Sequence, residues 1–441
     1  MPDLSDGTIG TWAVAGRHHG LALLDPPRTA AAEPAAPGRL RALTAHPLLM
    51  PYHRLTAAVL ALNAALAVWW VPGEPAARAG HLASADFVLA FAVRQQPLVN
   101  ALFRLALRSP HRWPLRRRWH LAKVYHHGGV HVGASVAGSA WSLVLAVATT
   151  RTGAAWPVLA VTWTLVALLV AVCVLAAPAV RHRRHDLFEM SHRYGGWSAL
   201  LLLWAQALLT GHAVWVLVLL TVLVAVPWLR LRRVPVQVER PSGHLAVLTL
   251  ADGTRPTPGA YTALSRHPLG QWHGFALVPS PGEAAFRVMV SRAGDWTSSL
   301  IDAPPRHVWV KGVPTSGMAT VAGMFRSVLW VATGSGIAPV LPHLLARSGE
   351  SHLLWVGRRP RETYGDEPAV RDHRGGRRPH AVGHHDAGQA RRDRPRPPAA
   401  PRDRRGGRGG HLEQGPHLAG RAPAERRGGA DLRRDLGLVS A

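Results

Sequence analysis

Two short segments between residues 258 and 300 carry side chains that could bind a flat cofactor. Residues 272–275 read Trp-His-Gly-Phe, and residues 294–297 read Gly-Asp-Trp-Thr. Aromatic rings can stack on a flat ring system, and an imidazole can exchange a hydrogen bond with a polar ligand. The flanking residues form short β runs broken by Gly and Pro, which predicts a small barrel over residues 231–320. Ordinary barrel core and turns explain the strands, but they do not explain a polar His-Gly pair between two aromatic residues.

These strands resemble the FAD-binding barrel of membrane ferric reductases and NADPH oxidases. In that family a Gly-Gln-Tyr strand, a Trp-His-Pro-Phe-Thr strand and an Arg-x-x-Gly-Asp-Trp-Thr segment hold the flavin. This chain departs from the pattern with Gly274 in place of Pro, Ala276 in place of Thr, and an Arg one position later than the family's. The resemblance implies non-covalent FAD, held by Tyr261, Thr262, Trp272, His273, Phe275, Arg292, Trp296 and Thr297.

The composition limits the classes of protein to consider. At 441 residues the chain can hold two or three domains. The formal charge of +26 lies in loops between apolar runs and in a C-terminal tail, so nucleic acid is not expected as a partner. Cys173 is the single Cys, which excludes a disulfide framework and a thiolate zinc site. The N-terminus carries Asp3 and Asp6 and lacks a basic start followed by an apolar stretch, so a cleaved signal peptide is not expected.

Six apolar runs between residues 51 and 230 predict a six-helix transmembrane domain. A helix of roughly 20 residues crosses a bilayer, and each run is close to this length. Runs this apolar and this closely spaced are unlike the core helices of a globular protein. The second run is the weakest, because Arg94, Gln95, Gln96 and Asn100 interrupt it. The runs are Leu55–Val71, Leu82–Leu107, Val124–Thr149, Ala154–Val180, Ser191–Leu209 and Ala213–Leu229.

The placement of basic residues predicts the orientation. Segments 104–123, 181–184 and 230–233 are strongly basic, whereas the alternate connections hold almost no Lys or Arg. Basic loops stay on the cytosolic side, so we expect a multi-pass protein of the plasma membrane with both termini in the cytosol. Residues 1–50 are rich in Ala, Pro and Arg without periodicity, and we expect a disordered cytosolic arm there.

Histidines at the starts of two of these helices could bind a haem. His127 and His131 are four residues apart on one expected helix face, and His192 begins a parallel helix at the same depth. The family carries haem on these helices, so the resemblance implies one inner haem held by His192 with His127 or His131. The alternative is that these imidazoles are solvated neighbours of Arg and lipid headgroups. No second His follows about four turns along either helix, so no outer haem is expected.

Residues 328–339 read as an apolar strand, a Gly-Ser-Gly turn and a helix start. Such a turn lets backbone N–H groups approach a phosphate at a helix N-terminus. The segment resembles the Gly-Thr-Gly-Ile-Thr-Pro signature of ferredoxin–NADP reductase-type nucleotide domains. This implies NADPH or NADH binding by Gly334, Ser335, Gly336, Ile337 and Pro339. Arg358 and Arg359 follow the next strand and suit the 2′-phosphate of NADPH, although a solvated loop explains the pair equally well.

The chain changes character at Pro368, in the middle of this nucleotide domain (321–367). Residues 368–441 are rich in Arg, Gly and Pro and have almost no apolar periodicity. Codons can be chosen for segments 382–393 and 431–440 so that translation shifted by one base gives sequence typical of a folded protein. In the second segment the shifted frame then reaches a stop codon. We therefore predict that this tail is frame-shifted; the alternative is a disordered tail that binds acidic partners.

The predicted fold is an α-helical membrane domain followed by an α+β cytosolic module, with an FAD-binding β-barrel and a truncated or frame-shifted α/β nucleotide domain. The predicted function is electron transfer from NAD(P)H through FAD to an inner haem or a membrane-proximal acceptor, in which the cofactors do the chemistry. No side chain is an evident catalytic acid or base. The alternative is a redox-sensing membrane flavoprotein without haem, and residues 125–129 and 192–197 resemble fungal relatives of ferric reductases that lack it.

Overall fold

The computed structural model describes residues 9–14, 22–24, 46, 49–70, 73–211, 214–279, 284–346 and 350–358. Arg359 and the tail from Pro368 therefore lie outside the described residues, and so does the predicted change of reading frame. The described part contains a set of long helices, a seven-stranded sheet and a four-stranded sheet.

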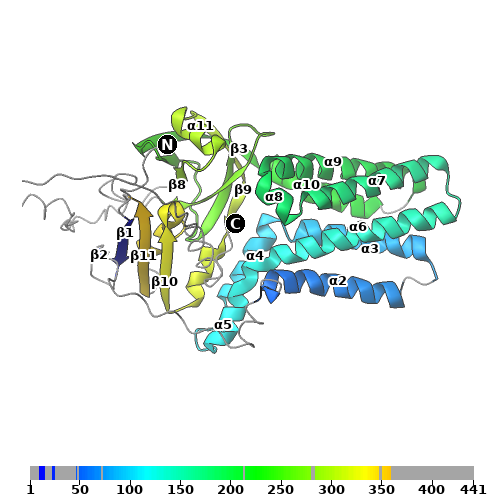
Figure 1. Ribbon diagram of the computed structural model, residues 1–441, viewed down its shortest axis with the longest axis horizontal. Coiled ribbons are helices and arrows are strands. Elements are labelled where there is room, and N and C mark those ends of the chain that lie inside the picture. The colour runs from blue at the N-terminus through cyan, green and yellow to red at the C-terminus, as the bar shows by residue number, and fades with distance from the viewer. Residues whose placement is uncertain are drawn as a thin grey trace, which may run out of the picture. The chain divides into compact units, whose positions relative to one another are not determined.

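The long helices run side by side (Figure 1). They occupy approximately the six predicted apolar runs: α2 (Pro51–Trp69), α3 (Pro75–Ala92), α6 (Gly128–Arg151), α7 (Trp156–Leu175), α9 (His185–Thr210) and α10 (Val214–Leu229). Short helices connect them: α4 (Gln96–Leu107), α5 (Leu115–Ala122), η2 (Lys123–His127) and α8 (Pro178–Arg183). Several begin at a proline, which fits the first turn because the N–H it lacks would have no partner there.

Length and composition qualify only some of these helices as membrane spans. Within the described residues, Leu115–Arg151 and Trp156–Leu175 qualify, and α3 with α4 would make a third if that bent pair is one span. The helix α10 is apolar but has 16 residues, and polar residues such as Asn63 and Gln206 interrupt α2 and α9. The prediction of six spans is therefore not confirmed as a whole.

The second predicted run is not one helix. It divides into α3 and α4, whose axes differ by 71°. The polar residues that weakened the run explain the bend, because two of them bind the backbone of β9 (His307–Ser316). Gln96 donates to Lys311 O and accepts from Val313 N, and Asn100 donates to Pro314 O and accepts from Ser316 N. The side chains of α4 thus pair with backbone N–H and C=O groups along one edge of β9, as a neighbouring strand would.

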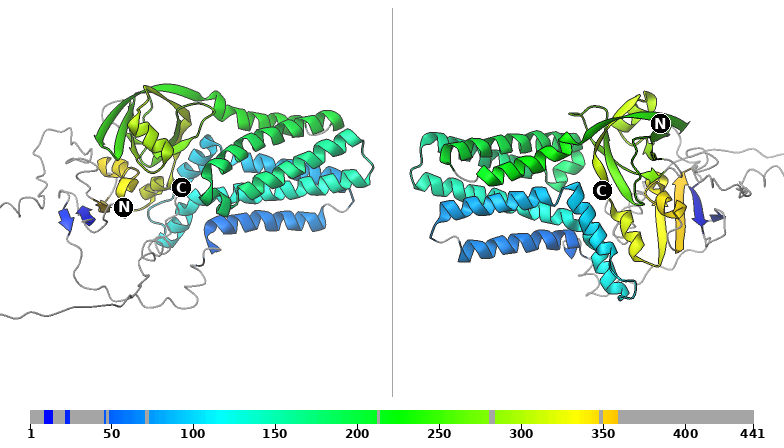
Figure 2. Two further views of the ribbon diagram at one scale, coloured as in Figure 1. Left: turned by 45° about the horizontal axis from the view of Figure 1, so that its top comes forward. Right: turned by 180° about the vertical axis from the view of Figure 1, so that it is seen from behind.

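The seven-stranded sheet is antiparallel throughout and has the order β6-β5-β9-β3-β4-β8-β7. Figure 2 shows the sheet curling beside the helix α11 (Asp295–Asp302). Leu248, Leu264, Phe286 and Val288 are buried inside it. The remaining strands are β3 (Leu231–Ser242), β4 (Leu245–Leu250), β5 (Ala260–Ser265), β6 (His273–Ala276), β7 (Val278–Pro279) and β8 (Phe286–Ser291). This agrees with the short strands expected for residues 231–320; their antiparallel pairing was not predicted.

The second sheet is built around two parallel strands, β10 (Ser327–Thr333) and β11 (Glu350–Arg358). The chain crosses between them through η4 (Gly334–Ile337) and α12 (Leu341–Leu345), and η3 (Met318–Met324) precedes the first strand. This crossover has the strand–turn–helix–strand order predicted for the nucleotide domain.

Two N-terminal strands extend this second sheet. β1 (Ile9–Val14) pairs antiparallel with β11, and β2 (Ala22–Leu24) pairs with β1. We expected a disordered arm over residues 1–50, so these strands are a difference from the sequence analysis. An unpaired strand edge exposes a row of N–H and C=O groups, and β1 satisfies the free edge of β11.

Candidate functional site

Three of the predicted flavin ligands lie together at one end of the barrel. His273 and Phe275 lie on β6, and Trp296 lies in the first turn of α11. The Trp296 ring lies 4.2 Å from the His273 ring at 34°, and 6.0 Å from the Phe275 ring at 30°, measured between ring centroids. The alternation of β6 directs both side chains to the face that packs against the barrel core. The arrangement is a tilted stack of aromatic rings with one imidazole in it.

His273 brings an unsatisfied polar atom into this stack. Its Nε2 is buried and has no hydrogen-bond partner among the described residues. Burial lowers the pKa of His273 below its usual value, while the carboxylate of Glu189 partly opposes this. The imidazole is therefore neutral near pH 7, and its buried Nε2 can donate or accept a hydrogen bond, depending on the tautomer.

The start of α11 is fixed beside the stack. Thr297 Oγ1 accepts from the N–H groups of Ala293 and Gly294 and donates to Gly294 O. These bonds fix the first turn of the helix and therefore the position of Trp296. The partial positive charge at a helix N-terminus favours an anion such as a phosphate.

The other predicted flavin ligands of the barrel lie outside this stack. Arg292 is held by Asp302 through two bonds of 3.0 and 2.6 Å, and it also donates to Gly243 O. Tyr261 is exposed on β5, whereas Thr262 is buried with no partner for its Oγ1 among the described residues. Trp272 donates its backbone N–H to Glu189 Oε1 of α9 and packs 6.3 Å from Trp228. The prediction that Arg292 contacts the cofactor stays a prediction; its guanidinium is paired with Asp302 at the end of α11.

Sequence reasoning missed a cluster that joins α9 and α10 to the barrel. Arg193 pairs with Glu189 and donates to the carbonyls of Leu269 and Gly270, both at 2.9 Å. Lys311 Nζ lies 4.3 Å from the centroid of the Trp228 ring. Burial lowers the pKa of Lys311 to about 8, the nearby Arg193 charge acts in the same direction, and Glu189 opposes both. The available signal was that Lys311 is one of two Lys in the chain.

The glycine turn after β10 has the predicted local geometry. Gly334 has φ +50°, in the left-handed region that favours glycine, and Trp355 Nε1 donates to its carbonyl at 2.9 Å. A Cβ at Gly336 would meet nothing within 4 Å, so the backbone there is open to a ligand. Ile337 is buried in a cluster that joins β10, β11 and α12 to β4 and β7. Ser335 lies within this turn, Pro339 follows it, and Arg358 ends β11.

The predicted haem ligands are partly brought together. The rings of His131 on α6 and His192 on α9 have centroids 6.2 Å apart and planes at 73°. His131 Nδ1 is hydrogen-bonded to Ala90 O at 2.9 Å, which leaves Nε2 for a metal. His127 belongs to η2 rather than α6, and its Nδ1 is within 3.2 Å of Val124 O. His127 therefore lies at the junction of η2 and α6, four residues before His131.

A polar network inside the helices was also missed. Asn63 donates to Asp86 Oδ1 at 3.3 Å and accepts from Trp141 Nε1 at 2.7 Å, and all three side chains are buried. The network links α2, α3 and α6. Asp86 is the single acid in the predicted run Leu82–Leu107, which was the available signal.

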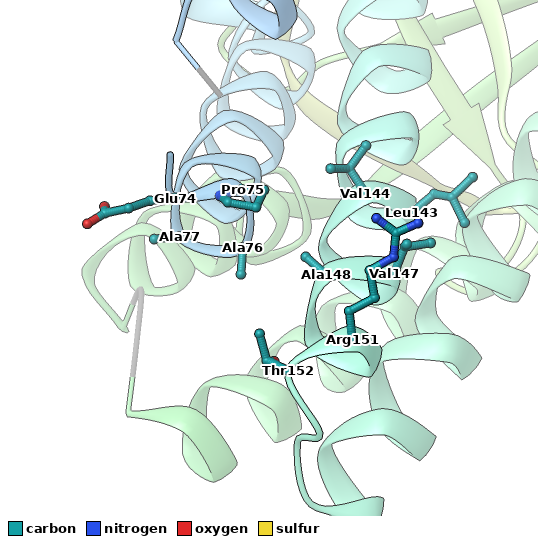
Figure 3. Close-up of a pocket in the computed structure, with 10 residues that line it drawn as sticks. All are labelled: Glu74, Pro75, Ala76, Ala77, Leu143, Val144, Val147, Ala148, Arg151 and Thr152. Atoms are coloured by element: carbon teal, nitrogen blue, oxygen red, sulfur yellow. The ribbon is translucent and has the colours of Figure 1, made fainter. Parts of the chain in front are cut away.

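One cavity of about 750 Å³ lies between the start of α3 and the end of α6 (Figure 3). Its wall is mostly Ala, Val and Leu, with Glu74 and Arg151 as the two charged residues. His131 lies near the opposite end of α6, about 25 Å from Ala148 at 1.5 Å per residue. The cavity therefore contains none of the predicted cofactor ligands.

Comparisons with known proteins relate the chain to reductases. Residues 318–393 match the family model described as the C-terminal domain of adenylate-forming reductase 03009, and this match continues past Pro368. Adenylate-forming reductase 03009 of Coprinopsis cinerea is 37% identical over 354 residues, which cover 75% of this chain and 34% of the relative. The chain thus spans about a third of the length of that relative.

Two further comparisons cover smaller parts of the chain. NADPH oxidase 3 of Homo sapiens is 35% identical over 68 residues, which cover 15% of this chain and 12% of the relative. A ferredoxin NADP+ reductase from Neisseria gonorrhoeae with bound FAD and NADP aligns with a TM-score of 0.22 at 14% identity, over 26% of this chain and 50% of that chain. A TM-score this low carries no argument about fold or function.

Proposed function

We propose that the chain is a membrane-bound oxidoreductase that passes electrons from NAD(P)H through FAD to a membrane-proximal acceptor. The observation that carries this proposal is the stack of His273, Phe275 and Trp296 at the start of α11. It combines surfaces for a flat ring, an unsatisfied imidazole nitrogen and a helix start suited to phosphate. FAD contains a flat ring system and a pyrophosphate, so the residues fit this cofactor.

In this proposal the chain's residues bind and orient the cofactors. Phe275 and Trp296 hold the flavin ring, and His273 Nε2 with the first N–H groups of α11 bind its phosphates. The glycine turn at 334–336 binds the nicotinamide nucleotide. Bound FAD would accept a hydride and release single electrons. The adenylate-forming reductase and NADPH oxidase relatives support this class of activity, because both names describe redox enzymes.

Two alternatives remain for the electron acceptor: an inner haem, or no haem at all. His131 and His192 lie close enough for a shared ligand, which favours one inner haem on the predicted cytosolic side. The alternative is a redox-sensing flavoprotein without haem. With or without haem, Arg193 and Lys311 pack on the Trp228 ring and hold the barrel to α9 and α10.

Haem content tests these alternatives. We expect at most one haem per chain in protein purified in mild detergent, because the described helices bring together one His pair. Pyridine haemochrome analysis measures the ratio of haem to protein. His192→Ala should remove a bound haem, whereas His53→Ala, at the start of α2, should leave it unchanged. One haem supports the electron-transfer branch and none supports the sensor branch, whereas two haems per chain would contradict the proposed site.

The reading frame of the tail leads to a separate prediction. Among the described residues the nucleotide sheet has two parallel strands, so we expect the 441-residue chain to bind FAD but to oxidise NADPH slowly. The family match through residue 393 does not favour a break at Pro368. If the tail is frame-shifted in spite of this match, sequencing the gene across the Glu367 codon will reveal a one-base error. A clean read of the printed frame, together with rapid NADPH oxidation by this chain, would end the hypothesis.

A further inference from the structure

A second cavity, on the outer surface of the barrel, has an unusual concentration of positive charge. Its volume is about 690 Å³, and no acidic residue lines it. Three arginines, two histidines, two prolines and one tryptophan form the wall: Arg233, Arg266, His267, Pro268, Pro305, Arg306, His307 and Trp309. None of them belongs to the stack of His273, Phe275 and Trp296.

Strand register explains why these side chains gather on one face. Arg233 of β3 is the direct cross-strand partner of Trp309 of β9. Neighbouring Val234, Val308 and Val310 are buried in the barrel core. Because side chains alternate along a strand, Arg233, His307 and Trp309 must point outward together. The cavity is therefore a consequence of the sheet.

The arginines of this cavity have N–H donors without hydrogen-bond acceptors among the described residues. The guanidinium groups of Arg233 and Arg306 have no hydrogen bond or ion pair with any residue that the structure describes, and both side chains are exposed. Arg266 is held by Ser299 and Ala303, but its buried Nε has no acceptor among the described residues. Guanidinium groups pair strongly with phosphate oxygens, two bonds at a time.

The position of the cavity is close to the predicted membrane surface. Arg233 follows the last residue of α10, Leu229, by four residues, a reach of about 13 Å. The loop 266–270, which forms one wall, is held to α9 through the bonds of Arg193 to Leu269 and Gly270. A basic pocket at the cytosolic ends of transmembrane helices is suited to an anionic headgroup.

We propose that this cavity binds a phosphate-bearing anion, separate from the FAD site. Arg233 and Arg306 provide the two free guanidinium groups, and Trp309 forms an apolar wall between the strands. The same chemistry recognises the headgroup of an anionic phospholipid and a soluble diphosphate, so the test must separate these sources.

The first experiment uses full-length, FAD-saturated protein in phosphatidylcholine nanodiscs and inorganic pyrophosphate as the probe, measured by isothermal titration calorimetry. We expect Arg233→Gln with Arg306→Gln to weaken binding at least about tenfold. Arg255→Gln, which removes an exposed barrel arginine outside the cavity, should leave binding unchanged. Should the double variant fail to fold, the single variant Arg306→Gln carries the test, with size-exclusion elution as the control for folding.

The second experiment adds phosphatidic acid to the nanodiscs. If the natural ligand is a lipid, phosphatidic acid should reduce pyrophosphate binding to the wild-type protein; if it is soluble, binding should not change. Both results support the site. Pyrophosphate binding that is absent, or that survives in the folded variants, overturns it, because the anion then binds elsewhere or not at all. Loss of flavin absorbance in the variants also overturns it, because the cavity would then belong to FAD.

Discussion

The double variant His273→Ala, Trp296→Ala is expected to bind FAD roughly a hundredfold more weakly than the wild-type chain. A hydrogen bond to a charged group contributes about 1.5–3 kcal/mol and an aromatic stack about 1 kcal/mol. Their combined loss, about 3 kcal/mol, corresponds to two orders of magnitude in Kd. Titration of FAD into apoprotein, followed by quenching of flavin fluorescence, measures the effect.

Two controls separate a loss of ligand contacts from a loss of fold. His244→Ala removes an exposed imidazole from the β3–β4 turn of the same barrel and should leave FAD affinity unchanged. Trp296→Phe keeps an aromatic ring on His273 and should retain most of the affinity. If the double variant elutes as a folded protein and still binds FAD with wild-type affinity, the stack is not the flavin site.

Gly129→Ala is expected to destabilise the helical part of the protein by about 1–3 kcal/mol or more, the usual cost of overpacking. A Cβ at this position would overlap the backbone carbonyl oxygen of Tyr52 on α2. The backbones of α2 and α6 approach closely here, and Thr56 Oγ1 donates to Gly129 O at 2.9 Å. Backbone atoms cannot rotate away as a side chain does, so the helices must separate.

Gly196→Ala is the matched control for this variant. Gly196 is also helical, in α9, but a Cβ there would meet nothing within 4 Å. Alanine favours a helix over glycine by about 1 kcal/mol, so the control should be neutral or slightly stabilising. Size-exclusion chromatography in detergent after heating to a series of temperatures gives the midpoint of thermal unfolding for each variant. Equal midpoints for both variants would contradict the close packing of α2 and α6.

The sequence was informative where one local pattern decides the structure. Short β runs broken by Gly and Pro over 231–320 predicted the strands of a small barrel, and the Gly-Ser-Gly turn after an apolar strand predicted the turn and helix that follow β10. Apolar runs predicted the approximate positions of five long helices, whereas the second run divides between α3 and α4. The resemblance named His273 and Trp296 as ligands of one cofactor, and the structure places their rings 4.2 Å apart; their role as ligands stays a prediction.

The remaining features depend on contacts between distant parts of the chain. Gln96 and Asn100 appeared as interruptions of an apolar run, and their role became visible only when β9 was placed beside α4. The ion pair between Arg292 and Asp302 joins the end of β8 to the end of α11, and no local pattern predicted it. The pairing of β1 with β11 joins residues at opposite ends of the described chain, and no local periodicity predicts it.

Flavin content of the purified full-length protein tests the central proposal most directly. We expect protein incubated with FAD and then desalted to show a flavin absorbance spectrum, with close to one FAD per chain released on denaturation. The cofactor should be non-covalent, because the stack offers hydrogen bonds and ring contacts rather than a nucleophile. Folded, full-length protein that stays colourless after addition of FAD would contradict the account.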